Sequence, residues 1–212
     1  MTAVTHEATR PAGGIGWAAQ AVRRSPSQAR RDFRSLLDVL ARPGLTARLV
    51  PSPDVPAATV PAACLADVEV PLAVIGGEDW ARALALATGA PAADPENARM
   101  VLALRPLTPA EIAALPRGDA LHPELGCRLV QAVDGLSEGP DAGGVVLTLN
   151  GPGVPGERRL TVKGMPAESF HALAEANAAF PAGTDTFLVA PDGTVAGLPR
   201  SVRMTIENGG TG

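Results

Sequence analysis

One amphipathic segment near the start of the chain, residues 28–44, constrains the fold more than any other stretch. Its sequence, QARRDFRSLLDVLARPG, ends in Pro43 and Gly44, which stop a helix and permit a tight turn. Large apolar side chains recur at the i, i+3, i+4, i+7 spacing of one helical face: Phe33, Leu36, Leu37 and Leu40. The pattern predicts a helix that buries this stripe in the core, followed by an extended run over 45–50.

Alternating helices and strands follow this segment, and strands dominate the later part of the chain. The helices are expected over 57–66, 79–87, 108–115 and 166–179. The strands are expected over 71–75, 99–104, 127–133, 145–149, 158–162, 186–190 and 195–206. We expect the strands between 127 and 162 to form an antiparallel meander. The order predicts an α/β fold, a three-layer domain on a mixed β-sheet.

This domain is expected to be a single unit covering residues 25–207. No linker long enough to divide it occurs, and 212 residues suffice for a sizeable core. The first 24 residues, rich in Gly, Pro and Thr, predict a flexible N-terminal arm, and residues 208–212 predict a loose C-terminus. Apolar residues make up 46% of the chain but aromatic residues only 3%, so the core should be aliphatic.

Charge and cysteine content exclude several classes of function. A net charge of −4 gives no basis for a general nucleic-acid binder, which needs a basic stripe. No run of 18 or more apolar residues occurs, so no membrane span is expected. The N-terminal residues lack the basic and apolar regions of a signal peptide, and we expect a cytoplasmic protein. Cys64 and Cys127 belong to no CxxC pair. Two free thiols are the favoured state, and a disulfide between them is the alternative.

Residues 151–156, GPGVPG, form a literal G-x-G-x-x-G, the pattern of dinucleotide-binding loops. That loop works by presenting backbone N–H groups at a helix N-terminus. Here Pro152 and Pro155 remove two donors, and the next segment, 157–163, has the pattern of a strand. A rigid β-turn is the better interpretation.

Four segments, taken in order, resemble the PhnH family of bacterial phosphonate metabolism. The first is the FR-x-LL-x-x-x-x-x-PG helix and turn that ends at Gly44. Residues 149–154 (LNGPGV) are similar to the family's GPG turn, and 180–189 (FPAGTDTFLV) to its FPxGxDxxL segment. Residues 198–203 (LPRSVR) are similar to its closing IPRTTxV, with Ser201 and Val202 in place of two threonines. The resemblance spans about residues 28 to 206.

The resemblance implies a fold related to the large domain of pyridoxal-phosphate-dependent transferases but without the cofactor. It implies a non-catalytic, accessory subunit of the carbon–phosphorus lyase core complex, together with PhnG, PhnI and PhnJ, and a homodimer in isolation. That complex is implied to form ribose 1-phosphonate 5-triphosphate from ATP and an alkylphosphonate before the C–P bond is cleaved. The alternative is an independent transferase that binds pyridoxal phosphate or a nucleotide.

Lys163 is the sole lysine of the chain, and a pyridoxal-phosphate enzyme needs one Schiff-base lysine. It lies between Val162 and Gly164 in a predicted hairpin strand, and no phosphate-cradling loop is recognisable. We therefore assign no cofactor-binding residue.

No catalytic residue and no metal ligand is assigned either, because no His/Cys/carboxylate cluster has metal-ligand spacing. His6 falls in the arm, His122 in a His-Pro turn, and His171 lies four residues before Glu175 on a helix, a spacing typical of a solvated surface pair. Two pairs of carboxylates, Asp67/Glu69 and Glu78/Asp79, could be acid–base dyads, but the interpretation as exposed carboxylates in loops is favoured. One of Arg200 and Arg203 could bind an anion bidentately, but a structural ion pair is favoured.

Overall fold

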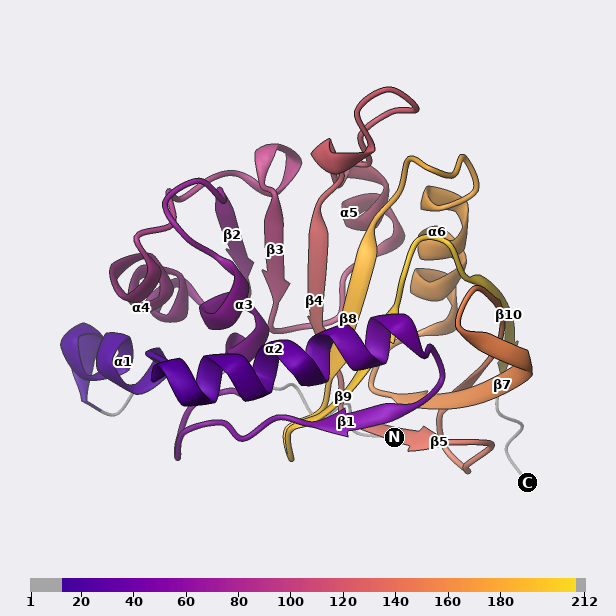
Figure 1. Ribbon diagram of the computed structural model, residues 1–212, viewed down its shortest axis with the longest axis horizontal. Coiled ribbons are helices and arrows are strands. Elements are labelled where there is room, and N and C mark those ends of the chain that lie inside the picture. The colour runs from indigo at the N-terminus through magenta and orange to yellow at the C-terminus, as the bar shows by residue number, and fades with distance from the viewer. Residues whose placement is uncertain (1–12, 209–212) are drawn as a thin grey trace.

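The computed structural model describes residues 13–208, which form helices and strands in alternation (Figure 1). The α-helices are α1 (Gly14–Val22), α2 (Pro26–Ala41), α3 (Thr59–Leu65), α4 (Glu78–Thr88), α5 (Pro109–Ala114) and α6 (Ala167–Ala176). Two 3₁₀ turns are η1 (Pro95–Asn97) and η2 (Pro123–Leu125). The strands are β1 (Thr46–Arg48), β2 (Leu72–Ile75), β3 (Met100–Ala103), β4 (Arg128–Ala132), β5 (Gly135–Glu138), β6 (Val145–Gly151), β7 (Val154–Lys163), β8 (Asp185–Val189), β9 (Thr194–Leu198) and β10 (Arg203–Asn208).

The strands form two sheets. The larger is mixed, with the order β1-β9-β8-β4-β3-β2, and its neighbours from β2 to β8 run parallel. Strands β9 and β1 complete it in antiparallel pairing. The smaller sheet, β10-β6-β7-β5, is antiparallel throughout. The predicted α/β class with a mixed sheet is therefore confirmed.

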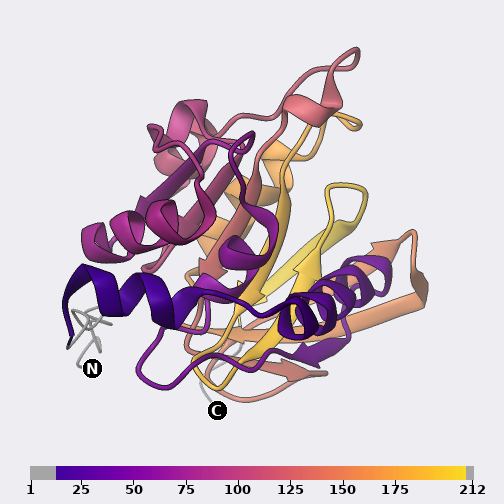
Figure 2. The same cartoon turned by 60° about the vertical axis from the view of Figure 1, so that its left-hand side comes forward.

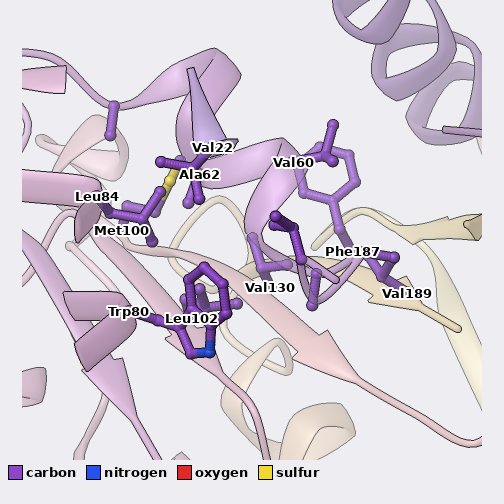
Figure 3. Close-up of a cluster of buried hydrophobic side chains, with 14 of the residues drawn as sticks. Val22, Val60, Ala62, Trp80, Leu84, Met100, Leu102, Val130, Phe187 and Val189 are labelled. Carbon is purple, nitrogen blue, oxygen red and sulfur yellow. The ribbon is translucent and has the colours of Figure 1, made fainter. Parts of the chain in front are cut away.

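Each face of the larger sheet carries its own core, because successive side chains of a strand point to opposite sides. In β3, Met100 and Leu102 join the core under α1 to α4, whereas Val101 and Ala103 join the other core. Figure 3 shows the first core, where Trp80 of α4 lies by Leu102. The second core lies between the sheet, α5, α6 and the smaller sheet. Both views place α2 and α3 over one face of the large sheet (Figures 1 and 2).

Capping boxes open two of the helices. In α2 the Ser25 side chain accepts the N–H of Gln28, whose side chain accepts the N–H of Ser25. In α5 the pair is Thr108 and Glu111, with a proline at the first helical position. Glu111 also takes two hydrogen bonds from Arg105, and these bonds, together with those from Thr108, lower the pKa of the Glu111 carboxyl to about 2. These ends follow directly from the sequence.

The predicted buried stripe of α2 is wrong in two of its four residues. The buried positions are Asp32, Leu36 and Val39, whereas Phe33 is 44% exposed and Leu37 is 50% exposed. The cause lies in β9, where a Cβ on Gly197 would stand 2.7 Å from the backbone of Val39. Since the helix backbone approaches the strand this closely, the 32–36–39 side of α2 faces the sheet and the 33–37 side faces solvent.

Asp32 can be buried in α2 because it has a charged partner. The guanidinium of Arg24, in the link from α1, lies 2.7 Å from the Asp32 carboxylate, and both side chains are almost fully buried. Arg24 also donates to the carbonyl oxygen of Val50. A buried charge is costly unless it is paired and hydrogen-bonded, so this pair fixes which side of α2 faces inward.

Three further expectations need correction. Strand β4 was expected in an antiparallel meander but lies in the large sheet, parallel to β3 and β8, and β5 pairs with β7 in its place. The expected strand over 195–206 divides into β9 and β10, in different sheets. The expected arm contains α1, which buries Ala18, Ala19 and Val22, so that part of it is ordered. Residues 1–12 and 209–212 lie outside the described residues.

Candidate interaction surface

Arg200 fastens two loops beside the start of β8. Its Nε and Nη2 atoms donate to Oδ2 of Asp185, at 3.2 and 2.8 Å, and its backbone N–H donates to Oδ1 of the same carboxylate. Its Nη1 donates to the carbonyl oxygen of Pro123 at 2.7 Å and reaches that of Pro181 at 3.4 Å. The Arg200 side chain is 13% exposed. We call this arrangement the Arg200 clasp.

The clasp joins the loop before β4 to the loop before β8. Residues 115–127 form the first loop and residues 177–184 the second. They are tied again where the N–H of Gly183 donates to the carbonyl oxygen of Arg117 at 2.8 Å. In Figure 1 both loops lie at the top, at the amino-terminal ends of β4 and β8. Charged hydrogen bonds are among the stronger contacts in proteins, so the clasp should hold this edge in one conformation.

Large apolar side chains project from the two fastened loops. Leu121 is 85% exposed, Leu125 46% and Phe180 63%. Beside them His122 Nδ1 lies 3.3 Å from Glu124, and Asp119 accepts backbone N–H groups of its own loop. Local partners therefore engage two of the acidic groups of this edge, while the apolar side chains stand uncovered. Neither the exposed leucines nor the role of Asp185 was predicted, although Phe180 and Asp185 both fall in the segment 180–189.

Two other segments that resemble the PhnH family, the one ending at Gly44 and residues 149–154, also contact each other. The turn that ends α2 packs on the hairpin turn between β6 and β7, where Arg158 Nη1 donates to the carbonyl oxygens of Pro43 and Gly153. Gly153 has a φ of +80°, and a Cβ there would stand 2.1 Å from the carbonyl oxygen of Ala41. Only glycine tolerates both conditions. The G-x-G-x-x-G is thus a β-turn and the start of a strand, as predicted.

Lys163 ends β7, the hairpin strand in which it was predicted. Its Nζ atom lies 2.7 Å from Oδ2 of Asp141, and both side chains are partly exposed. That hydrogen bond, with a second from Ser137, lowers the pKa of the Asp141 carboxyl. The lysine therefore belongs to a surface ion pair on the smaller sheet.

The remaining sequence candidates do not converge on one site. His171 and Glu175 are both exposed on α6 and form no hydrogen bond with each other. Asp67 and Glu69 lie in an exposed loop, as predicted. The same prediction is wrong for Glu78 and Asp79, which lie in the first turn of α4, where Asp79 pairs with Arg82. His6 lies outside the described residues. The prediction of a structural ion pair is confirmed for Arg200.

Arg203, on β10, is exposed and lies in no ion pair within residues 13–208. Within the same residues, no group of three or more His, Cys, Asp or Glu side chains could hold a metal ion. No helix in that part of the chain is long and apolar enough to cross a membrane.

A cleft of about 340 Å³ opens between α1, α3 and α4, with Arg23 and Arg24 on its polar wall. Arg24 already holds Asp32 and Val50, so it has little capacity left for a ligand. Of the two cysteines, which form no disulfide, Cys127 is buried beside Thr184.

The four segments that resemble a known family all lie within the part of the chain that matches a family model. Residues 20–205 match the model of the family described as "Bacterial phosphonate metabolism protein (PhnH)", and the chain belongs to this family. It is also 34% identical over 185 residues to a protein of Stutzerimonas stutzeri named "Putative C-P lyase subunit protein HtxG". That alignment covers 82% of this chain and 85% of the relative. The predicted resemblance is therefore confirmed.

Proposed function

We propose that this chain is an accessory, non-catalytic subunit of the carbon–phosphorus lyase core complex, joining PhnG, PhnI and PhnJ subunits in the cytoplasm. In that role it supports formation of ribose 1-phosphonate 5-triphosphate from ATP and an alkylphosphonate, the step before C–P bond cleavage. Membership of the phosphonate-metabolism family supports this proposal, as does the relative that is named as a C–P lyase subunit.

The Arg200 clasp is the observation that favours an accessory role over catalysis. Arg200 is one of the two arginines considered as an anion binder, yet its Nε, Nη1 and Nη2 atoms all donate to protein oxygens. A guanidinium committed in this way positions backbone and does not grip a phosphonate. What the clasp leaves available is the apolar edge of Leu121, Leu125 and Phe180. We propose that this edge contacts a neighbouring subunit.

An exposed apolar edge on a fastened loop pair suits association because little freedom is lost when it binds. Ordering loops and side chains at an interface costs free energy, and a fixed surface avoids much of that cost. Buried aromatic anchors also tend to dominate binding energies. Phe180 is one of only four phenylalanines in the chain, and it is 63% exposed.

The alternative is an independent transferase that binds pyridoxal phosphate or a nucleotide, on a fold like the large domain of pyridoxal-phosphate enzymes. The ion pair of Lys163 with Asp141 gives this alternative no support. A colourless purified protein that captures the other subunits would favour the accessory role. A yellow protein with the absorbance of an internal aldimine would favour the transferase.

Genetic complementation tests the accessory role. Deleting the gene should abolish growth on a phosphonate as phosphorus source, and the wild-type chain should restore it. Single alanine changes at Lys163, His122 and His171 should also restore growth, because these side chains are exposed or partly exposed and none is one of the three apolar side chains of the proposed contact. Loss of growth from one of them, with the protein folded and the complex assembled, would contradict a non-catalytic role.

Native mass spectrometry tests the assembly itself. The isolated chain should run as a homodimer, and it should co-purify with PhnG, PhnI and PhnJ when all four are expressed together. Replacing Leu121 and Phe180 with aspartate should weaken that co-purification, since both changes place a charge on the apolar edge without touching a buried group. Full capture by this variant would overturn the assignment of the edge.

A further inference from the structure

The outward side of α2 forms a second exposed surface, with the opposite charge to the chain as a whole. Arg30, Arg31 and Arg34 are exposed there and make no hydrogen bond or ion pair with any of residues 13–208. Phe33 and Leu37 lie on successive turns beside them, 44% and 50% exposed. We call these five residues the α2 face. The chain as a whole carries a net charge of −4.

The acidic groups of the helix do not neutralise this face. Asp32 is buried against Arg24 on the opposite side of the helix. Asp38 is exposed but pairs with Arg42 at 3.1 Å. Three positive charges therefore surround two uncovered apolar side chains, on a helix whose other side is anchored to β9 and α3.

We propose that the α2 face docks an acidic surface of a different subunit, one with an apolar recess for Phe33 and Leu37. The proposal rests on the accessory-subunit function proposed above and names the chemistry of one partner. Charges arranged in complementary patches steer two proteins together and suppress wrong partners. Aromatic and arginine side chains are enriched where interfaces bury their cores.

The charge of the α2 face argues against a second copy of this chain as its partner. A two-fold contact across this face would bring the three arginines of each copy together, with Asp38 as the only exposed acid of each α2. Like charges placed opposite each other are costly. Two apolar side chains are also too few for a helix that lies on a membrane, which needs a continuous apolar face.

Capture of the co-expressed subunits of the complex, followed by measurement of affinity against salt, tests the proposal. The test variant carries Arg34→Glu and Leu37→Ala, and its matched control carries Arg203→Glu and Leu86→Ala. Leu86 is 59% exposed on α4, and Arg203 is exposed on β10, so each control change repeats the chemistry at a site outside the α2 face. Glutamate and arginine have similar helix propensities, so α2 should persist in the test variant.

We expect the test variant to bind the remaining subunits at least about tenfold more weakly and the control to bind within about twofold of wild type. Wild-type affinity should also fall more steeply with salt than that of the variant, because exposed charges are screened. The mass of the isolated protein should not change. Equal capture by variant and wild type would overturn the α2 proposal while the accessory function stands.

A changed mass of the isolated variant would identify a second copy as the occupant, which also overturns the proposal. Binding of the wild-type chain to phosphatidylglycerol vesicles, lost in the test variant, would replace the subunit with a membrane. If the wild-type chain captures no subunit at all, the accessory function fails, and the α2 proposal falls with it.

Discussion

Replacing Arg200 with alanine should loosen the loops at the amino-terminal ends of β4 and β8 more than replacing any exposed arginine, because the Arg200 side chain is only 13% exposed. The variant loses two hydrogen bonds to Asp185, one to the carbonyl oxygen of Pro123 and a longer one to that of Pro181. Breaking a buried ion pair costs about 3–5 kcal/mol. The Asp185 side chain is 25% exposed and water can rehydrate it, so we expect a loss of about 2–4 kcal/mol.

Urea unfolding at pH 7 measures this loss of unfolding free energy. For a chain of this size, the same loss should lower the Tm of the variant by roughly 5–15 °C. Hydrogen exchange gives the local result: amides of the loops at 115–127 and 177–184 should exchange faster, because the clasp that ties them is gone. Arg203→Ala is the control, since Arg203 is exposed and should cost less than about 0.5 kcal/mol. Equal losses at both arginines, or unchanged loop exchange in the Arg200 variant, would refute the clasp.

Four further outcomes are expected. Leu36→Ala should cost about 2–5 kcal/mol, whereas Leu37→Ala, half exposed, should cost less than about 1 kcal/mol; equal losses would mean that α2 is rotated. Glu111→Gln should destabilise the protein at pH 7. The depressed pKa of Glu111 stabilises the fold above pH 4.5, so the difference from wild type should shrink as pH falls towards 2. Burial raises the pKa of Cys127 to about 11, so its thiol should resist iodoacetamide at pH 8 until urea unfolds the protein. Borohydride reduction after incubation with pyridoxal phosphate should leave Lys163 unmodified, and a stoichiometric adduct would show that it binds the cofactor.

Local sequence patterns determined where many of the helices and strands lie. Thr108, Pro109 and Glu111 predicted the start of α5 because the capping residues and the proline act within one turn of the helix. The prolines at 152 and 155 excluded a dinucleotide loop because they remove donors from the backbone itself, and the structure has a β-turn there. Such effects depend only on residues close in the chain, so they can be predicted without a tertiary structure.

The pairing of strands and the outward side of α2 could not be predicted in this way. A strand offers similar hydrogen-bonding edges to any partner, so residues 128–132 fit a meander as well as the centre of a parallel sheet. In α2 the periodicity of the sequence defined a stripe through Phe33 and Leu37. The glycine at 197 and the buried partner of Asp32 decided that a different side faces the sheet.

The four family-like segments show the same division. The sequence was enough to identify the FPAGTD and LPRS segments and to predict a structural ion pair for Arg200. Only the tertiary structure brought Arg200 to Asp185, 15 residues earlier in the chain, and to the carbonyl oxygen of Pro123, 77 residues earlier. Contacts over such separations form only where the strands place the loops together. The sequence therefore determined the local elements, and packing decided which side chains stay exposed.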